Sequence, residues 1–175
     1  MKYFLLFFFS TFALAKNPAL KNFREAYRSL AVSTQITPDE NLAKIYDLFK
    51  ETLPKTGKVS EYSGPMQLAA IQLSGAFCEK RIALDSTLSP EKRFLHKSIN
   101  FTQSPKALTQ SHKESLIDEY ADAFWQRPTT IEEEKILLEG IGTLANLGGD
   151  TELDMKVFLT LFCTVFGTST DFLTI

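Results

Sequence analysis

Cys78 and Cys163 are the residues whose chemistry the sequence constrains most, because a thiol can form a disulfide bond, bind a metal or act as a nucleophile. Each cysteine follows a phenylalanine inside an apolar pattern with helical spacing, and neither belongs to a Cys-x-x-Cys-His haem-attachment sequence. We predict a disulfide bond between them. In the chain-entropy model, closing a loop of about 85 residues is worth about 4 to 5 kcal/mol. Two separate buried thiols, or one catalytic thiol, are the alternatives.

The two histidines, His96 and His112, are poorly placed for metal chemistry. They lack the His-Glu-x-x-His spacing of zinc proteases, and neither forms a close Cys-His pair. We expect both to be surface or partly buried polar residues, and we expect no metal and no cofactor.

Carboxylates gather at two places in the sequence. Glu114, Asp118 and Asp122 recur every four residues and therefore share one face of a helix, where like charges repel by a few tenths of a kcal/mol per pair. This face is a candidate surface for a basic partner, and a solvated face is the alternative. Glu132, Glu133 and Glu134 are consecutive and point about 100° apart, so the helix dipole explains them better than a shared ion does.

The first fifteen residues predict export. Lys2 precedes an apolar run from Phe4 to Phe12, and Ala13-Leu14-Ala15 has the small-x-small pattern of a signal-peptidase site. We predict a signal peptide over 1–15, a single domain over 16–175, and a bacterial protein that is periplasmic or secreted. An uncleaved anchor is the alternative, but the run is shorter than the roughly 20 apolar residues of a membrane span. No stable span is expected after cleavage.

The charge of the mature chain argues against nucleic acid as a partner. Removing Lys2 with the leader leaves 18 basic and 21 acidic residues, a formal net charge of −3. A basic stripe that follows phosphates is not expected from this balance.

Hydrophobic periodicity and cap residues predict an all-α fold, an irregular bundle of about seven helices with one disulfide bond. Thr37-Pro38-Asp39-Glu40, Ser89-Pro90 and Ser104-Pro105 each place a hydroxyl N-cap before proline, and Ser111 with Glu114 offers a second start for the fifth helix. The predicted helices cover 19–33, 38–53, 65–84, 90–98, a segment from Ser104 or Ser111 to Trp125, 128–148 and 151–167.

The end of the chain is apolar and allows two structures. Phe172, Leu173 and Ile175 either return to the core as a short extended tail or form a free apolar end that contacts a partner.

Two segments carry a resemblance to a known group of proteins. Ala69 to Cys78 (AAIQLSGAFC) and Phe162 to Ser169 (FCTVFGTS) look like cysteine-bearing helical segments of secreted bacterial proteins, some of which also have laminin-G-like lectin domains. This chain has no such lectin domain. The resemblance implies a disulfide-joined helical module outside the cytoplasm, and it transfers no catalytic residue.

These patterns favour an exported, non-enzymatic helical module that binds an envelope or extracellular protein or helps to assemble an envelope structure. A small secreted cell-wall hydrolase that uses Glu61 as its acid is the alternative. An inhibitor or immunity-like protein is a third possibility.

Overall fold

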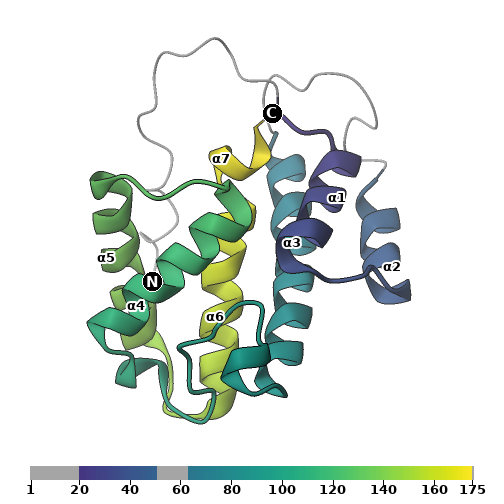
Figure 1. Ribbon diagram of the computed structural model, residues 1–175. Coiled ribbons are helices and arrows are strands. Elements are labelled where there is room, and N and C mark those ends of the chain that lie inside the picture. The colour runs from purple at the N-terminus through teal and green to yellow at the C-terminus, as the bar shows by residue number, and fades with distance from the viewer. Residues whose placement is uncertain (1–19, 51–62, 175) are drawn as a thin grey trace.

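The computed structural model describes residues 20–50 and 63–174, which form α-helices joined by turns and by one longer irregular segment over 87–109 (Figure 1). No strand is found in these two ranges apart from an isolated bridge between Leu20 and Thr174. The helices are α1 (Phe23–Thr34), α2 (Glu40–Phe49), α3 (Gly64–Ser86), α4 (Gln110–Tyr120), α5 (Ile131–Leu147), α6 (Glu152–Gly167) and α7 (Thr170–Leu173), with the short turns η1 (Pro90–Lys92), η2 (Pro105–Ala107) and η3 (Ala121–Trp125). The predicted all-α class is confirmed. The leader and Glu61 lie outside the described residues.

The central pair of the bundle is α3 and α6, which make the most extensive contact between any two elements (Figure 1). The pair is antiparallel, because Cys78 joins Cys163 while the earlier Ser74 contacts the later Gly167. Helices α1 and α2 pack against α3, whereas η3 and α5 contact α6 from the other side. The pair therefore connects two smaller groups of helices, which also touch each other where α1 contacts η3.

Helix α1 begins later than the periodicity predicts, because Asn22 is its N-cap. The Asn22 side chain accepts the Glu25 N–H at 3.1 Å, and the Glu25 carboxylate accepts the Asn22 N–H at 2.8 Å, which completes a capping box. The predicted Phe-Tyr face does dock the helix. Phe23 stacks on Tyr46 of α2 with ring centroids 5.1 Å apart, and Tyr27 meets Phe77 of α3 edge to face at 5.4 Å.

The predicted N-cap of α2 at Thr37 is wrong by two residues. Asp39 is the cap, and its carboxylate accepts the Leu42 N–H at 3.1 Å and the Lys80 ammonium of α3 at 2.6 Å. These bonds lower the pKa of Asp39. Asp caps a helix as well as Thr does, and here it also gains a charged partner that local sequence does not reveal. The predicted end of this helix at Leu53 lies outside the described residues.

The predicted helix over 90–98 is wrong, because only the single turn η1 forms there. The Asp85 carboxylate accepts the N–H groups of Phe94 and Leu95, both at 3.3 Å. The Arg93 side chain donates to three backbone carbonyls, those of Leu88, His96 and Ile99. Side chains thus bond to backbone N–H and C=O groups that would otherwise have bonded to each other within a helix.

Neither predicted start of α4 is its N-cap. Ser104 caps only the turn η2, while Thr109 accepts the His112 N–H at 3.3 Å and the His112 ring accepts the Thr109 N–H in return. This reciprocal pair takes the place of the expected Ser111 and Glu114 box. After Tyr120 the helix widens into the π-helical turn η3, which ends at Gln126 in a left-handed conformation with φ of 55°.

Helix α5 begins three residues later than the predicted start at Pro128, whereas α6 begins directly after the predicted cap Thr151. Thr130 with Glu133 and Thr151 with Asp154 form capping boxes at the starts of α5 and α6, and Gly148 ends α5. Beyond α6 the predicted extended tail is instead the short helix α7. The two ends of the described chain meet there, since the Lys21 N–H donates to the Leu173 carbonyl at 2.7 Å.

Candidate functional site

The predicted disulfide bond is present and joins the two central helices. Cys78 of α3 and Cys163 of α6 are both fully buried, with Cα atoms 5.9 Å apart and a sequence separation of 85 residues. Neither thiol is therefore available as a nucleophile or a metal ligand. The bond constrains the long stretch of chain between α3 and α6, which includes α4 and α5.

Small side chains let α3 and α6 approach closely next to this bond, toward the start of α3 and the end of α6. A Cβ on Gly167 would lie 2.2 Å from the Ser74 hydroxyl oxygen, so only glycine fits there. Gly75 lies opposite Thr164 of α6, whose hydroxyl oxygen is 3.7 Å from the position that a Cβ on Gly75 would take. The buried Ser74 hydroxyl has no hydrogen-bond partner among the described residues.

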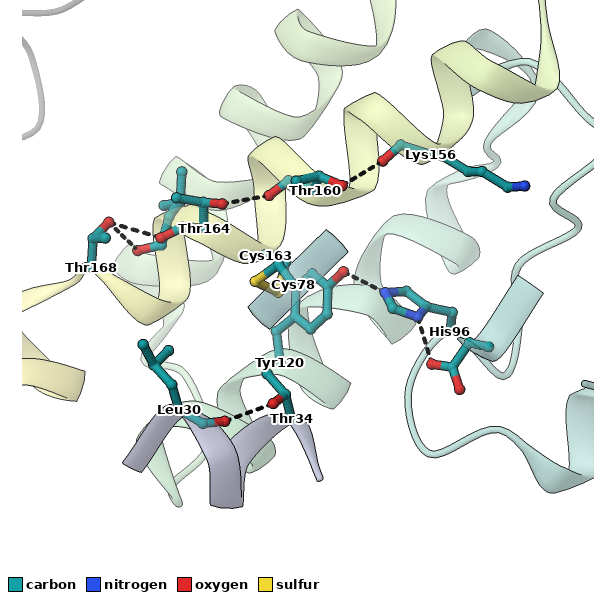
Figure 2. The surroundings of a disulfide bond; sticks show 12 residues. Leu30, Thr34, Cys78, His96, Tyr120, Lys156, Thr160, Cys163, Thr164 and Thr168 are labelled. Atoms are coloured by element: carbon teal, nitrogen blue, oxygen red, sulfur yellow. Dashed lines mark hydrogen bonds and ion pairs between the residues drawn. A yellow bond between two sulfur atoms is a disulfide. The ribbon is translucent and has the colours of Figure 1, made fainter. Parts of the chain in front are cut away.

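A row of threonines runs along α6 beside the disulfide bond (Figure 2). The hydroxyls of Thr160, Thr164 and Thr168 each donate to the carbonyl four residues earlier, at 2.9, 2.7 and 2.8 Å. Each of these hydroxyls donates its hydrogen bond within its own stretch of chain and not to a neighbouring helix.

The second feature is a buried polar chain of Asp85, His96 and Tyr120, in which every side chain is fully buried. His96 Nδ1 lies 2.8 Å from an Asp85 carboxylate oxygen and its Nε2 lies 2.6 Å from the Tyr120 hydroxyl, as Figure 2 shows for the histidine and tyrosine. An ionised carboxylate only accepts, so Nδ1 carries the proton and Nε2 accepts the tyrosine O–H. The expectation that His96 is a surface or partly buried residue is wrong.

Asp85 is the acceptor that organises this chain. Besides His96, its carboxylate accepts the Arg81 guanidinium of the same helix at 2.5 Å and the two backbone N–H groups that prevent a helix after η1. Arg81 is itself buried, and its Nε has no hydrogen-bond partner in the described part of the chain. A buried carboxylate with this many donors is well compensated for its loss of water.

Burial sets the protonation of the chain. It lowers the pKa of His96 despite the opposing effect of the Asp85 carboxylate, so the imidazole is neutral. Burial also raises the pKa of Tyr120 well above its usual range, with further contributions from Glu119 and Asp85. The pKa of Glu119, whose carboxylate accepts the His96 N–H at 2.5 Å, is raised mainly by burial too.

An Asp-His-Tyr chain has the composition of a proton relay, but its burial shows that it has a structural role here. None of its three side chains is exposed, and therefore no substrate touches them in this structure. Together they connect α3, the irregular segment after η1, and α4. The chain holds the segment around His96 in place, and its chemistry is that of a satisfied internal network.

The predicted acidic face lies on α4 and continues into η3. Asp118 and Asp122 are exposed, whereas Glu114 is half-buried and accepts the Gln110 side-chain amide at 2.9 Å. No group of three or more residues able to hold a metal ion occurs within 20–50 and 63–174. The face as a partner-binding surface remains a prediction.

The apolar tail that we also named as a contact surface is mostly internal. Phe172 and Leu173 are 1% and 7% exposed, and Phe172 packs against Phe124 with ring centroids 5.6 Å apart. Ile175 lies outside the described residues. Return to the core is thus the correct alternative for Phe172 and Leu173, and in this conformation they present little surface to a partner.

The first-turn glutamates of α5 serve the helix, as the sequence predicts. Glu133 completes the capping box and binds the Arg127 guanidinium at 2.7 and 2.9 Å, which lowers its pKa to about 2. Arg127 also pairs with Asp171 of α7, so one side chain links the end of η3 to α5 and α7.

An exposed apolar face on the central pair is a feature that the sequence alone did not single out. On α6, Leu153, Val157 and Leu161 recur every four residues and are 69%, 51% and 52% exposed. On α3, Leu68 and Ile71 lie on the side that carries Gly75, and they are 53% and 44% exposed. The contact between Gly75 and Thr164 places both rows on the same side of the pair. Because the helices are antiparallel, Leu68 and Ile71 lie beside the end of α6, whereas Leu153 and Val157 lie beside the end of α3. We call these five side chains the α3/α6 face.

Comparison with known proteins adds no homologue. No family model, no curated protein and no solved structure matches the chain. Among the described residues, no helix is both long and apolar enough to cross a membrane. The resemblance to cysteine-bearing helical segments therefore carries no residue role to this chain, and the hydrolase hypothesis built on Glu61 stays a prediction.

Proposed function

We propose that this chain is an exported, non-enzymatic helical module that binds another protein of the envelope or the extracellular space. The observation that carries the proposal is the buried Cys78–Cys163 bond between α3 and α6. Structural disulfides form and persist in oxidising compartments, so the bond fits the signal peptide that the first fifteen residues predict. Periplasm, outer surface and medium are all compatible with it.

The arrangement of polar groups supports a binding role over catalysis. His96 and Tyr120, whose pKa values burial shifts, are fully buried, whereas a general acid or base must come within hydrogen-bond reach of its substrate. The α3/α6 face supplies what a binding module needs, since Val157, Leu161 and their neighbours expose apolar surface on two helices that the disulfide bond holds together.

A capture experiment with matched variants tests this function. The full chain is expressed with export, recovered in its oxidised form, immobilised and exposed to envelope extract of the source cells. We expect a partner that Val157→Glu and Leu161→Glu each lose by about tenfold, because a carboxylate on the α3/α6 face disrupts apolar contact. Ile131→Glu is the control, since Ile131 is 83% exposed on α5 and does not belong to this face.

The acidic face is tested in the same experiment with the pair Asp118→Lys and Asp122→Lys. Loss of the partner in this variant alone would show that the binding surface lies on α4 and not on the α3/α6 face. Capture of no partner, or equal capture by all variants, would contradict the proposed function.

A further inference from the structure

The irregular segment over 87–109 contains an acceptor sequence for glycosylation. Asn100, Phe101 and Thr102 form the tripeptide Asn-x-Thr, in which the middle residue is not proline. Enzymes that attach a sugar to an asparagine amide recognise Asn-x-Ser or Asn-x-Thr. In the full sequence, no other asparagine has a serine or threonine two residues later. The chain therefore offers one acceptor of this kind.

The fold presents Asn100 on the surface and anchors both of its neighbours in the core. The side chains of Asn100 and Thr102 are exposed, whereas Ile99 and Phe101 are 2% and 4% exposed. The Phe101 ring meets the buried His96 ring edge to face, with centroids 5.9 Å apart. Because the flanking side chains point inward, the asparagine between them is held at the surface.

A tight turn determines how the Asn100 amide is used. The Gln103 N–H donates to the Asn100 backbone carbonyl at 3.2 Å, which closes a β-turn over 100–103. Asn100 Oδ1 accepts the Thr102 N–H at 3.1 Å and the Thr102 hydroxyl at 2.8 Å. A sugar is attached through Nδ2 and replaces one of its two hydrogens. The bonds to Oδ1 are therefore compatible with a sugar on the same side chain.

The acceptor lies where a transferring enzyme meets little regular structure. Asn100 follows the turn η1 and precedes the turn η2, outside every α-helix of the described chain. Surface segments of this kind open locally more readily than packed helices do. An enzyme that binds the tripeptide in an extended form needs to open one β-turn, whereas an acceptor inside α3 or α6 would require a helix to unfold.

We propose that Asn100 is an N-glycosylation site. Its Nδ2 attacks the anomeric carbon of a sugar that is activated as a diphosphate ester, the bond from that carbon to the diphosphate oxygen breaks, and the Nδ2 proton passes to a base of the transferring enzyme. Nucleoside-diphosphate sugars and lipid-diphosphate sugars both supply this leaving group. The inference does not rest on the proposed protein binding, because Asn100 does not belong to the α3/α6 face.

Peptide mapping by mass spectrometry tests the site on the full chain, expressed in and recovered from the source cells. We expect the peptide that contains Asn100 to carry an added mass equal to a whole number of sugar residues, and we expect fragmentation to place this mass on Asn100. Recovery of this peptide without any added sugar mass would overturn the proposal.

Three variants and one matched control test the acceptor sequence. Asn100→Gln and Thr102→Ala each lose the added mass, whereas Thr102→Ser keeps it because serine also satisfies the acceptor sequence. Asn146→Gln is the control, since Asn146 is exposed on α5 and is followed two residues later by glycine. It leaves the added mass unchanged. Added mass that survives in Thr102→Ala would overturn the proposal.

A full-chain variant that is retained in the cytoplasm distinguishes the two sugar donors. Phe7→Arg with Phe8→Arg interrupts the apolar run of the predicted signal peptide and blocks export. Added mass on both the parent chain and this variant identifies a nucleoside-diphosphate sugar that is used in the cytoplasm. Added mass on the parent chain alone identifies a lipid-diphosphate sugar that is used outside it.

Discussion

The Tyr120 hydroxyl lies 2.6 Å from Nε2 of His96, and both side chains are completely buried. This bond joins α4 to the irregular segment that follows η1, as does the bond from the His96 backbone N–H to the Glu119 carboxylate. Tyr120→Phe keeps the ring and leaves the imidazole nitrogen without a donor. We expect the free energy of unfolding to fall by about 1 to 3 kcal/mol, measured by chemical denaturation.

Tyr46→Phe is the control for this substitution. Tyr46 is half-buried, and its hydroxyl has no hydrogen-bond partner among the described residues. Its loss should change stability by less than about 0.5 kcal/mol. Equal effects of the two substitutions would show that the Tyr120–His96 bond contributes nothing specific.

The stability of the fold should depend on pH through His96. Burial places the pKa of the folded imidazole below its ordinary value of 6.5, so the unfolded chain binds more protons between these two values. The stabilisation is complete above about pH 6.5 and decreases as the pH falls toward the folded pKa. Chemical denaturation at pH 7.5 and 5.5 should therefore give a lower free energy of unfolding at pH 5.5.

Two histidine variants isolate this effect. His96→Asn should remove most of the difference between the two pH values, and asparagine tolerates the left-handed φ of 61° at this position. His112→Asn should keep it, since His112 is only partly buried. Glu119 opposes the trend, because its raised pKa makes the folded state bind protons more tightly above pH 4.5. An unchanged difference in His96→Asn would contradict the assignment.

Gly167 should tolerate no side chain. A Cβ there would also lie 3.1 Å from Leu30 Cδ2 and 3.3 Å from Phe124 Cε1, besides the conflict with Ser74. Gly167→Ala is expected to lower the free energy of unfolding by about 1 to 3 kcal/mol. Adding Ser74→Ala should recover part of this loss, because the closest atom is removed.

Gly142→Ala, in helix α5, should have the opposite effect on the free energy of unfolding. The nearest atom to a Cβ at Gly142 is Lys113 Nζ at 4.0 Å, and the position lies inside α5. Alanine should therefore raise stability by about 0.5 to 1 kcal/mol through helix propensity. A loss of stability in this variant equal to that of Gly167→Ala would contradict the close contact of α3 with α6.

Removing both sulfurs should destabilise the bundle without changing its fold. We expect Cys78→Ala with Cys163→Ala to lower the free energy of unfolding by about 2 to 4 kcal/mol relative to the oxidised protein. Circular dichroism of the double variant should remain helical. An undiminished free energy of unfolding would mean that the bond does not constrain the unfolded chain.

The parts of this structure that the sequence predicts depend on local signals. The acidic group Glu132 to Glu134 marks the first turn of α5, and Thr151 with Asp154 marks the start of α6, because helix-dipole and capping signals need only residues within one turn. The Cys78–Cys163 pairing is predictable for a different reason. Only two cysteines follow a predicted signal peptide, so one pairing is available.

The parts that it does not predict depend on long-range partners. The burial of His96 requires Asp85 and Tyr120, which lie 11 and 24 residues away, and no periodicity identifies them. The same carboxylate removes the expected helix after Pro90 by accepting two backbone N–H groups. Likewise, Lys80 favours Asp39 over Thr37 as the cap of α2 only once α2 and α3 are packed.

Mass spectrometry of the protein made from the full chain tests most directly whether the chain is an exported module with an oxidised α3–α6 pair. Intact mass and non-reducing peptide mapping are measured on material recovered from outside the cytoplasm. We predict an N-terminus at Lys16 and one cross-linked peptide that contains Cys78 and Cys163. A retained leader together with free thiols at both cysteines would contradict it.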